Sequence, residues 1–558
     1  MNLSGLEIKE QVIYQPVVAQ PSSGFFQKYF RWIFPLTLLI LALLAWYHRW
    51  MADDAFISFR YAENFVRGFG LVWNHGEHVE GYTNFLWTIM ISGVIALGGN
   101  PAVYSQFIGV GFFILSLFLT YRISVGIFHS ASIAFTIMVL LGFNYSFNAF
   151  ATGGLESSMQ TALFLLITYI CVQVFLISDW SFKTTLWLSL SVTIAMLTRL
   201  DSAVVCIGII VPAVFFAIKK DVLKKNFITH LILFSIPLIL ILGTWFLWKL
   251  SYYGDVLPNT FYTKVATPTS AEHGMYYLYF FFIEYFLIIF PIWWIFRIKT
   301  FFNSVNSNLV IVGIAMAAWL AYIIYIGGDH IEFRFLVPII PFLFIVIGWL
   351  IFTTTSMNIV RVFFILIILA GTIRHELTYK DSADPASGIA PLRQFDEEFT
   401  KEFGEWSRAG RMLKEAFNGN KNVWIATSGA GAIPFYSELP TIDMLGLNDR
   451  WIAHHGITLG TVPGHQRISP MSYLVNRNVN ILLGHPTIIK TGASLTQIPL
   501  APMDSTFTLI YATLILAPIS PAEQLVMVYL QQNSIVDEVI RRNNWGVINV
   551  KVNQLQSF

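Results

Sequence analysis

Two adjacent aspartates, Asp53 and Asp54, stand just past the first long apolar run, residues 32–48. A charge at the bilayer centre costs roughly 2.5–3.5 kcal/mol or more, so ionisable side chains at a membrane edge are candidates for function. An aspartate at such a place can take the proton of a hydroxyl group and act as a general base. Adjacent carboxylates also raise one another's pKa, which favours this chemistry near neutral pH. The alternative is that the pair ends a helix in a solvated loop, with Asp53 as the cap of the helix that follows.

Further polar motifs interrupt the apolar runs later in the chain. They are Glu77 to Asn84, Thr152 to Glu156, Arg199 to Asp201, Gly254 to Lys264 and Gly327 to Arg334. Basic residues in or near these motifs could stabilise a departing phosphate. They are Arg60, Arg199, Lys264, His330 and Arg334. An arginine beside an apolar run can also extend its head group to the membrane surface without binding a substrate.

The composition identifies the class of protein. Hydrophobic residues make up 56% of the 558 residues and charged residues only 12%, whereas a soluble domain carries about 25% charged residues. Several apolar runs reach the roughly 20 residues that cross a bilayer. The chain is therefore expected to be a polytopic α-helical membrane protein. Its net charge of +2 gives no reason to expect a nucleic-acid partner, and its two cysteines, Cys171 and Cys206, lie in apolar runs and predict no disulfide.

About eleven spans are expected from the apolar runs. They cover residues 32–48, 103–121, 131–149, 157–177, 184–198, 203–218, 228–249, 276–296, 309–326, 335–353 and 358–373. Basic loops such as Lys219 to Lys225 are held in the cytoplasm by the positive-inside rule, which places the N-terminus there too. The shorter apolar run 83–98 is read as a juxtamembrane or re-entrant helix on the external side, because a full span there would invert every later loop.

Three regions follow from these spans. Residues 1–31 form a cytoplasmic segment without a signal-peptide cleavage site, residues 32–374 form the transmembrane domain with a first external loop at 49–102, and residues 375–558 form a periplasmic α/β domain. Within the last region, Asp381 to Pro391 reads as a linker and Glu397 to Phe417 as a helix. Strands are expected at 423–427, 441–444, 479–483 and 507–516. Gly429-Ala-Gly431 lacks the third glycine of a dinucleotide-binding loop.

With this orientation, the polar motifs gather at one membrane face. A transporter should instead place polar groups near the bilayer midplane, on broken helices related by a repeat. The pattern favours an enzyme that works at the external face on a lipid-borne substrate. A flippase or transporter for a lipid-linked sugar, and a non-enzymatic envelope scaffold, are the alternatives from other classes.

The same motifs carry a family resemblance over residues 32–460. They are Asp-Asp-Ala-Phe-Ile-Ser-Phe-Arg-Tyr at 53–61, Gly-Leu-Val-Trp-Asn-His-Gly-Glu at 70–77, Val-Glu-Gly-Tyr-Thr-Asn-Phe-Leu-Trp at 79–87, Leu-Pro-Asn-Thr-Phe-Tyr at 257–262, Gly-Gly-Asp-His at 327–330, Arg-Phe-Leu-Val-Pro at 334–338 and Ile-Asp-Met-Leu-Gly-Leu at 442–447. With them the chain resembles the GT-C glycosyltransferases, which use polyprenyl-phosphate sugars. Within that superfamily it is most similar to the terminal β-(1→2) arabinofuranosyltransferases of mycobacterial cell walls and their bacterial relatives.

The resemblance implies an inverting transfer of a pentose, arabinofuranose, from a polyprenyl-phosphate donor to a cell-envelope glycan at the periplasmic face of the bacterial inner membrane. It places the base in the first external loop, with Asp54 favoured over Asp53, and one carboxylate per displacement implies a single inversion. A hexose or aminosugar transfer to protein or lipid A is the alternative within the superfamily. Candidate substrate-binding residues in the motifs are Glu80, Tyr82, Thr83, Asn84, Glu156, Asp201, Asn259, Tyr262, Asp329 and Glu332.

A metal ion is left open by the sequence. Asp53, Asp54, Glu80, Glu156, His330 and Glu332 are of the kind that Mg²⁺ or Mn²⁺ accepts, but no spacing among them is diagnostic. Some GT-C relatives use such an ion and others do not. For Glu156 and Asp201, capping of a helix end is an equally good interpretation.

Overall fold

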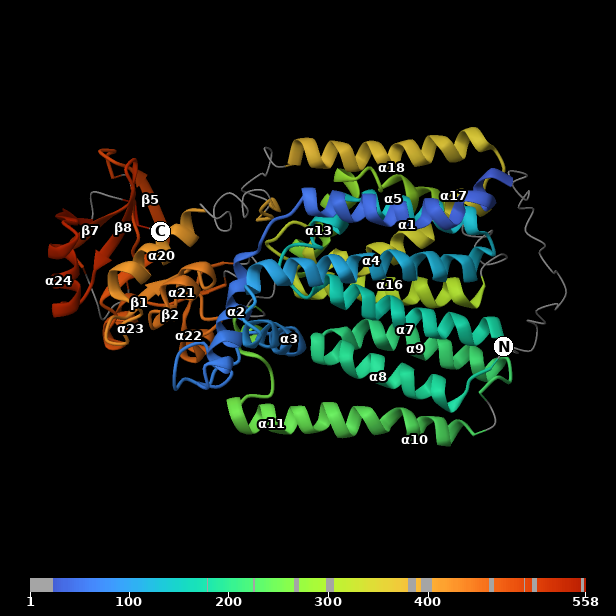
Figure 1. The fold of residues 1–558 in the computed structure, drawn as a ribbon, viewed down its shortest axis with the longest axis horizontal. Coiled ribbons are helices and arrows are strands. Elements are labelled where there is room, and N and C mark those ends of the chain that lie inside the picture. Colours follow the sequence, from blue (N-terminus) through green and yellow to red (C-terminus); the bar gives the residue numbers. More distant parts are fainter. Residues whose placement is uncertain are drawn as a thin grey trace, which may run out of the picture.

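The computed structural model divides into a helical bundle and a sheet-containing C-terminal domain that sits on one end of it (Figure 1). The described residues are 24–177, 179–223, 226–264, 270–297, 306–379, 388–392, 404–460, 466–495, 497–503, 509–552 and 556–557. Residues in the gaps include Lys224, Lys225 and Lys299 of the predicted cytoplasmic loops and most of the predicted linker.

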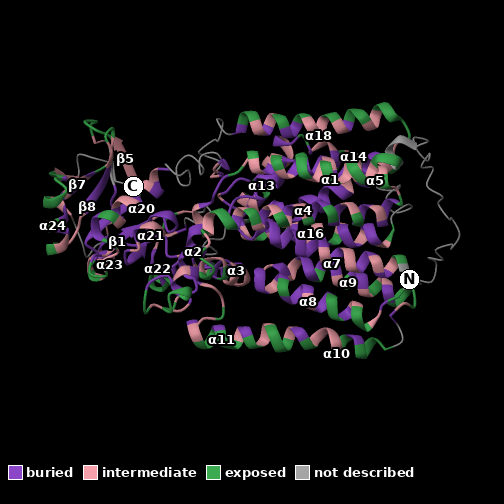
Figure 2. Cartoon of the chain, viewed as in Figure 1, coloured by how far each residue is buried: buried purple, intermediate pink, exposed green. Residues whose placement is uncertain are grey.

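Within these residues, eight helical segments are long and apolar enough to cross a membrane. They are α1 (Gly24–Tyr47), α4 (Pro101–Phe128), α7 (Ser157–Ile177), α9 (Ser202–Lys219), the continuous α10–η1–α11 (Phe227–Pro237, Leu238–Gly243, Thr244–Tyr253), α16 (Ser307–Ile326), η2 with α17 (Arg334–Ile339, Ile340–Thr353) and α18 (Asn358–Thr378). Figure 2 shows their buried sides turned inward and exposed sides outward, most completely in α10–η1–α11 and α18 at the edges of the bundle. The exposed side chains there are mostly apolar, as lipid contact requires.

The expected count of about eleven also includes three segments that fall short of a straight span. Helix α5 (Ala131–Phe143) has 13 residues, which is about 20 Å of helix, and α8 (Phe182–Thr198) has 17. Helices α13 (Ser270–Glu284) and α14 (Ile289–Phe296) are bent by 93°.

Two of the predicted spans are therefore not continuous helices. The run 131–149 breaks at Asn144, whose ψ of 120° is extended, before the short α6 (Tyr145–Ala149). The run 276–296 turns after Phe286, which adopts a left-handed φ of 55°. Both breaks depend on the conformation of a single residue inside an apolar run, and hydropathy does not register such a change.

The short apolar run 83–98 forms α3 (Phe85–Ala96), which packs on α2 (Asp53–Val66). Both helices lie at the end of the bundle that carries the C-terminal domain (Figure 1). They form the platform between the membrane helices and that domain.

The C-terminal domain is built on a six-stranded sheet with the order β2-β1-β5-β8-β7-β9. Strands β2 (Thr441–Asp443), β1 (Ile425–Thr427) and β5 (Ile481–Lys490) run parallel, whereas β8 (Glu523–Tyr529), β7 (Tyr511–Ser520) and β9 (Gly546–Lys551) join in antiparallel fashion. Helices α20 (Glu405–Phe417), α21 (Ala432–Ser437), α22 (Arg450–His455), α23 (Met471–Asn476) and α24 (Ser534–Arg542) accompany the sheet. The predicted strands correspond to β1, β2, β5 and β7, and the predicted helix to α20, so the α/β class is confirmed. Strands β8 and β9 were not expected.

Candidate functional site

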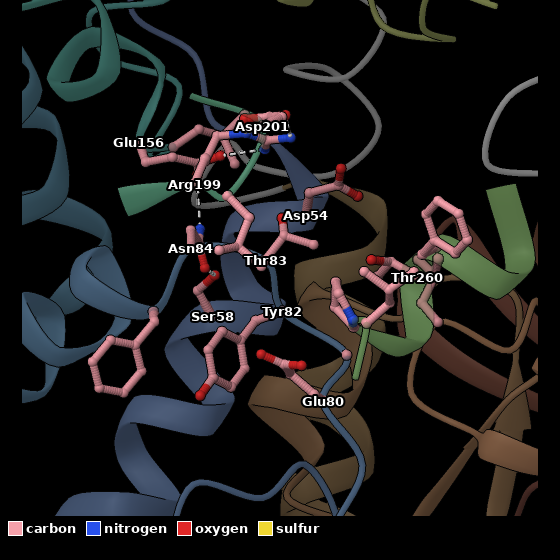
Figure 3. Close-up of a pocket in the computed structure, with 18 of the residues that line it drawn as sticks. Asp54, Ser58, Glu80, Tyr82, Thr83, Asn84, Glu156, Arg199, Asp201 and Thr260 are labelled. Carbon is pink, nitrogen blue, oxygen red and sulfur yellow. Dashed lines mark hydrogen bonds and ion pairs between the residues drawn. The ribbon is translucent and has the colours of Figure 1, made fainter. Parts of the chain in front are cut away.

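A cavity of about 390 Å³ opens where the bundle, α2 and the C-terminal domain meet (Figure 3). Its wall is formed by the start of α2, the segment 80–85, the ends of the membrane helices and Leu447 of the C-terminal domain. Ten of the predicted site residues line it. They are Asp54, Glu80, Tyr82, Thr83, Asn84, Glu156, Arg199, Asp201, Asp329 and Arg334. Residues from five separate motifs are thus brought to one site.

Asp54 is the cavity carboxylate that is most open to solvent. It stands in the first turn of α2, and its Oδ2 accepts a hydrogen bond from Nη1 of Arg334 at 2.6 Å. The side chain of Asp54 is 29% exposed, compared with 6% for Glu156, 9% for Asp201 and 2% for Asp329. A molecule that enters the cavity can therefore reach the Asp54 carboxylate more easily than the other three.

Arg334 is held in place by two carboxylates. Its Nη2 donates to Oδ1 of Asp329 at 3.0 Å, and its Nε donates to Oδ2 of the same group, which makes a two-pronged pair. Asp329 can reach Arg334 because Gly327 and Gly328 both adopt left-handed φ values, 89° and 74°, directly after α16. A Cβ at Gly328 would lie 2.7 Å from the ring of Tyr277, so the turn requires glycine there.

Arg199 forms a second cationic centre in the cavity wall. Its Nη1 donates to Oε1 of Glu156 and its Nη2 to Oδ2 of Asp201, each at 2.7 Å. Glu156 in turn accepts from Nδ2 of Asn84 at 2.7 Å (Figure 3). The ring of Phe335 lies 5.6 Å from the guanidinium of Arg199 and 5.7 Å from that of Arg334, within cation–π range of both. One aromatic ring therefore lies within reach of both cations.

Glu80 makes a buried ion pair at the outer side of the cavity. Its Oε2 lies 2.8 Å from Nζ of Lys249, which also donates to the carbonyl of Val256. Burial raises the pKa of Glu80 to about 7, and the charge of Lys249 opposes this shift. The neighbouring Tyr82 hydrogen-bonds Tyr253 through the two hydroxyl groups, 3.0 Å apart. The hydroxyl of Tyr82 is thus engaged in the protein interior, while its ring contributes to the wall.

Asp53 does not line the cavity. Its Oδ2 accepts from the backbone N–H of Gly431 at 3.0 Å and its Oδ1 from that of Ala432 at 2.8 Å, at the start of α21. A Cβ at Gly431 would lie 2.0 Å from the backbone oxygen of Asp53, so only glycine permits this close approach. Burial raises the pKa of Asp53 to about 7, and the charge of Asp54 adds to the increase. The raised pKa expected for the pair is therefore found on the carboxylate that anchors the C-terminal domain.

Five further predicted residues lie outside the cavity lining because other contacts engage them. Arg60 is buried and donates to the carbonyls of Trp73, Pro434 and Leu439, so it joins α2 to the C-terminal domain rather than facing a phosphate. Asn259 donates to the carbonyls of Gly446 and Leu447 at the same junction.

The other three are held by neighbouring side chains. Glu332 is buried and accepts from Nε2 of His375 at 2.7 Å. His330 lies against Asp329, and the ring of Tyr262 packs 4.4 Å from that of His454. The side chain of Lys264 lies outside the described residues.

Several residues at the site were not expected from the sequence. Lys249, which pairs with the wall residue Glu80, offered a clear signal, because a lysine within an apolar run is costly unless it has a partner. Ser58 and Leu447 line the wall from within the motifs 53–61 and 442–447, although neither was singled out. Trp245 and Tyr322 offered no signal, since each lies in an apolar helix, and they enter the wall only through tertiary packing.

The carboxylates proposed as metal ligands are not gathered at one point. Among the described residues, no three His, Cys, Asp or Glu side chains come close enough to share an ion. Asp54 and Glu156 are paired with arginines and Glu80 with a lysine, while Asp53 binds backbone amides. The arrangement suits a chemistry of one accessible carboxylate and two fixed guanidinium groups.

Comparison with known proteins identifies the family. Residues 29–380, more than half of the chain, match the model of the Alg9-like mannosyltransferase family. The chain belongs to this family. It is therefore a membrane glycosyltransferase, and the expected enzyme class is confirmed. Residues 393–529, in the C-terminal part, match a domain family of unknown function, DUF8728.

The GT-C fold is confirmed by a solved structure. The crystal structure of ArnT from Cupriavidus metallidurans bound to undecaprenyl phosphate is similar over 90% of this chain and 98% of that chain, with a TM-score of 0.54 and 12% identity. AglB from Archaeoglobus fulgidus, in complex with an inhibitory peptide and a dolichol-phosphate, aligns with 84% of this chain and 70% of its own, with a TM-score of 0.45 and 11% identity.

A curated relative matches a short segment. The terminal β-(1→2)-arabinofuranosyltransferase of Mycobacterium tuberculosis is 43% identical over 47 residues. The match spans only 8% of this chain and 8% of that relative.

Proposed function

We propose that this glycosyltransferase transfers a pentose, arabinofuranose, from a polyprenyl-phosphate donor to a cell-envelope glycan, with inversion at the anomeric carbon. The observation that carries the mechanism is Asp54, the accessible carboxylate of a cavity whose other acidic groups are enclosed with cations. Asp54 takes the proton of the acceptor hydroxyl as the new C–O bond forms. The bond from the anomeric carbon to the phosphate oxygen breaks, and polyprenyl phosphate leaves with the bonding electron pair.

The leaving phosphate needs fixed positive charge, which Arg334 and Arg199 offer. Both guanidinium groups line the cavity and are oriented by carboxylates before any substrate enters. A phosphate that binds Arg334 competes with Asp54 for its Nη1, so donor binding would release the Asp54 carboxylate for the acceptor. Preorganised charge of this kind stabilises a transition state without a reorganisation cost.

The lipid side of the cavity supports a donor with a hydrocarbon tail. Trp245 of α11 and Tyr322, Tyr325 and Ile326 of α16 line it, and Tyr325 is 68% exposed. A prenyl chain can lie along such an apolar edge while its phosphate reaches the arginines. The resemblance in fold to the ArnT structure with undecaprenyl phosphate favours the same class of carrier.

Arabinofuranose rests on the short match to the mycobacterial enzyme, whereas the family description favours mannose as the second candidate. The basic loops and the position of the cavity favour a periplasmic active site in the bacterial inner membrane. Purified protein would be given decaprenyl-phosphate arabinofuranose or decaprenyl-phosphate mannose, each radiolabelled, with a soluble arabinan acceptor. Transfer from the arabinose donor alone supports the proposal, and transfer from mannose alone assigns the enzyme to the second candidate. If neither labelled arabinose nor labelled mannose is transferred to the acceptor, the proposal of a pentose transfer from polyprenyl phosphate is overturned.

A further inference from the structure

A row of aromatic rings leads away from the mouth of the cavity across the C-terminal domain. It begins with Phe261 of α12 (Asn259–Lys264), which lines the cavity. The ring of the adjacent Tyr262 lies 5.8 Å from Phe261 and 4.4 Å from His454 of α22. We call the row, which continues through His455 to Trp451, the ring track.

The remaining steps of the ring track are of similar length. His454 and His455 are 6.2 Å apart, and His455 lies 5.4 Å from Trp451. Trp451 stacks on Tyr473 at 4.2 Å with an angle of 6° between the two rings. Tyr473 is itself fixed, because its hydroxyl donates to Asp449 and accepts from Arg477. The outer end of the ring track is therefore rigidly supported.

The ring track is open to solvent at four of its five rings, and Tyr262 is half-buried. Phe261 is 41% exposed and Trp451 is 40% exposed, and His454 and His455 are exposed as well. Exposed apolar surface that is contiguous, rather than scattered singly, marks interaction sites and ligand-binding grooves, and the ring track is contiguous with the cavity. The continuity with the cavity indicates which molecule they bind.

We propose that the ring track binds the sugar units of the acceptor glycan that lie behind the reacting unit. The C–H bonds on one face of a sugar ring carry a weak positive charge, and the face of an aromatic ring is weakly negative. A chain of sugars with its last hydroxyl at Asp54 would pass Phe261 and Tyr262 and then reach α22. Such contacts do not require a fixed set of hydrogen bonds to each sugar. The ring track can therefore hold a polymer whose units move along it after each transfer.

This inference rests on the proposed function, and the experiment separates the two. The full-length protein would be assayed with a fixed polyprenyl-phosphate arabinose donor and two soluble acceptors, an arabinofuranose disaccharide and an octasaccharide. In the wild type we expect a lower KM for the octasaccharide, since only the longer molecule reaches Trp451. Trp451→Ala should raise the octasaccharide KM about two- to tenfold, the range of one aromatic contact, and leave the disaccharide KM and the donor KM unchanged.

Two controls make the result specific. Tyr511→Ala removes an exposed ring from β7, which belongs to the sheet and not to the ring track, and should change neither KM. The disaccharide serves as an internal control for folding, because a misfolded Trp451→Ala variant would lose turnover with both acceptors.

The proposal is overturned by an octasaccharide KM that is the same in the wild type and in Trp451→Ala. It is also overturned if brominated lipid in vesicles quenches the part of the fluorescence of the 17 tryptophans that Trp451→Phe removes, because the ring would then be an interfacial membrane anchor. A wild type that transfers to neither acceptor refutes the proposed function instead.

Discussion

Asp54 differs from its neighbours in that its carboxylate can both meet an acceptor and pair with a cation. The Asp54→Asn side chain keeps nearly the same shape but cannot accept a proton at neutral pH. We expect turnover to fall about 10²- to 10⁴-fold, as loss of a general base typically does. The melting temperature should change little, because Arg334 keeps its two-pronged pair with Asp329. Initial rates and thermal unfolding measured on the same preparation check both expectations, and near-wild-type turnover would remove Asp54 from the mechanism.

Arg334 supports the site and is also expected to bind the donor. Replacing it with alanine removes the guanidinium from Asp329, which is 2% exposed, and breaking a buried ion pair in this way costs about 3–5 kcal/mol. Arg334→Ala should therefore lower both the melting temperature and the affinity for undecaprenyl phosphate. Arg334→Lys restores one charge but not the planar fork, so stability should recover more fully than affinity. Native mass spectrometry of lipid binding beside thermal unfolding compares the two, and full recovery of affinity in the lysine variant would make the fork dispensable.

At the scale of elements, α2 is held between the membrane bundle and the C-terminal domain. Asp53 binds the first amides of α21, and Arg60 reaches the carbonyls of Pro434 and Leu439 near its end. Since Asp54 is the next residue after Asp53, the C-terminal domain fixes the start of the helix that carries the proposed base. That arrangement gives this domain a structural part in the site, alongside the contribution of Leu447 to the wall.

The α2 junction makes stability dependent on pH in a defined direction. The pKa of Asp53 is raised from 3.8 to about 7 in the folded protein, so between these values the folded state binds more protons than the unfolded state. Stability conferred by Asp53 must then fall as the pH rises from about 4 to about 7. Asp53→Asn removes this titration. We expect the melting temperature of the wild type, minus that of the variant, to decrease across this window, and a difference that is constant or increases with pH would contradict the burial of Asp53.

The elements also show where sequence information ends. Motif residues such as Asp54, Glu156, Arg199 and Arg334 could be assigned to one site because their types and places at the membrane edge point to the same chemistry. The roles of Asp53 and Arg60 could not be assigned from the sequence. An aspartate or arginine that lines a substrate cavity and one that binds the backbone of a distant helix look alike in sequence. The partner residues lie more than 370 positions away. Contacts between such distant residues leave no mark on the hydrophobic periodicity of the sequence. The break in the helix at Phe286 leaves none either.

For the whole molecule, the distribution of charge sets the orientation in the membrane. The bundle end opposite the C-terminal domain, where α1 begins (Figure 1), carries basic residues on its loops and helix ends. They include Arg31, Arg122, Lys183, Lys219, Lys220 and Arg297. By the positive-inside rule we expect this end to face the cytoplasm. The cavity, α2 and the C-terminal domain would then lie together on the outer side, where a glycan could reach Asp54 without crossing the bilayer.

Cysteine labelling can test this orientation without altering the site. The native Cys171 and Cys206 are buried, so a membrane-impermeant maleimide should not react with them in the folded protein. Ala493→Cys places a thiol on an exposed turn of the C-terminal domain, and Lys219→Cys places one at the exposed end of α9. In intact spheroplasts we expect labelling at position 493 at once and at position 219 only after the membrane is permeabilised. The reverse pattern would put the cavity on the cytoplasmic side. The positive-inside rule would then have given the wrong orientation for this protein, and an envelope glycan could not be the acceptor.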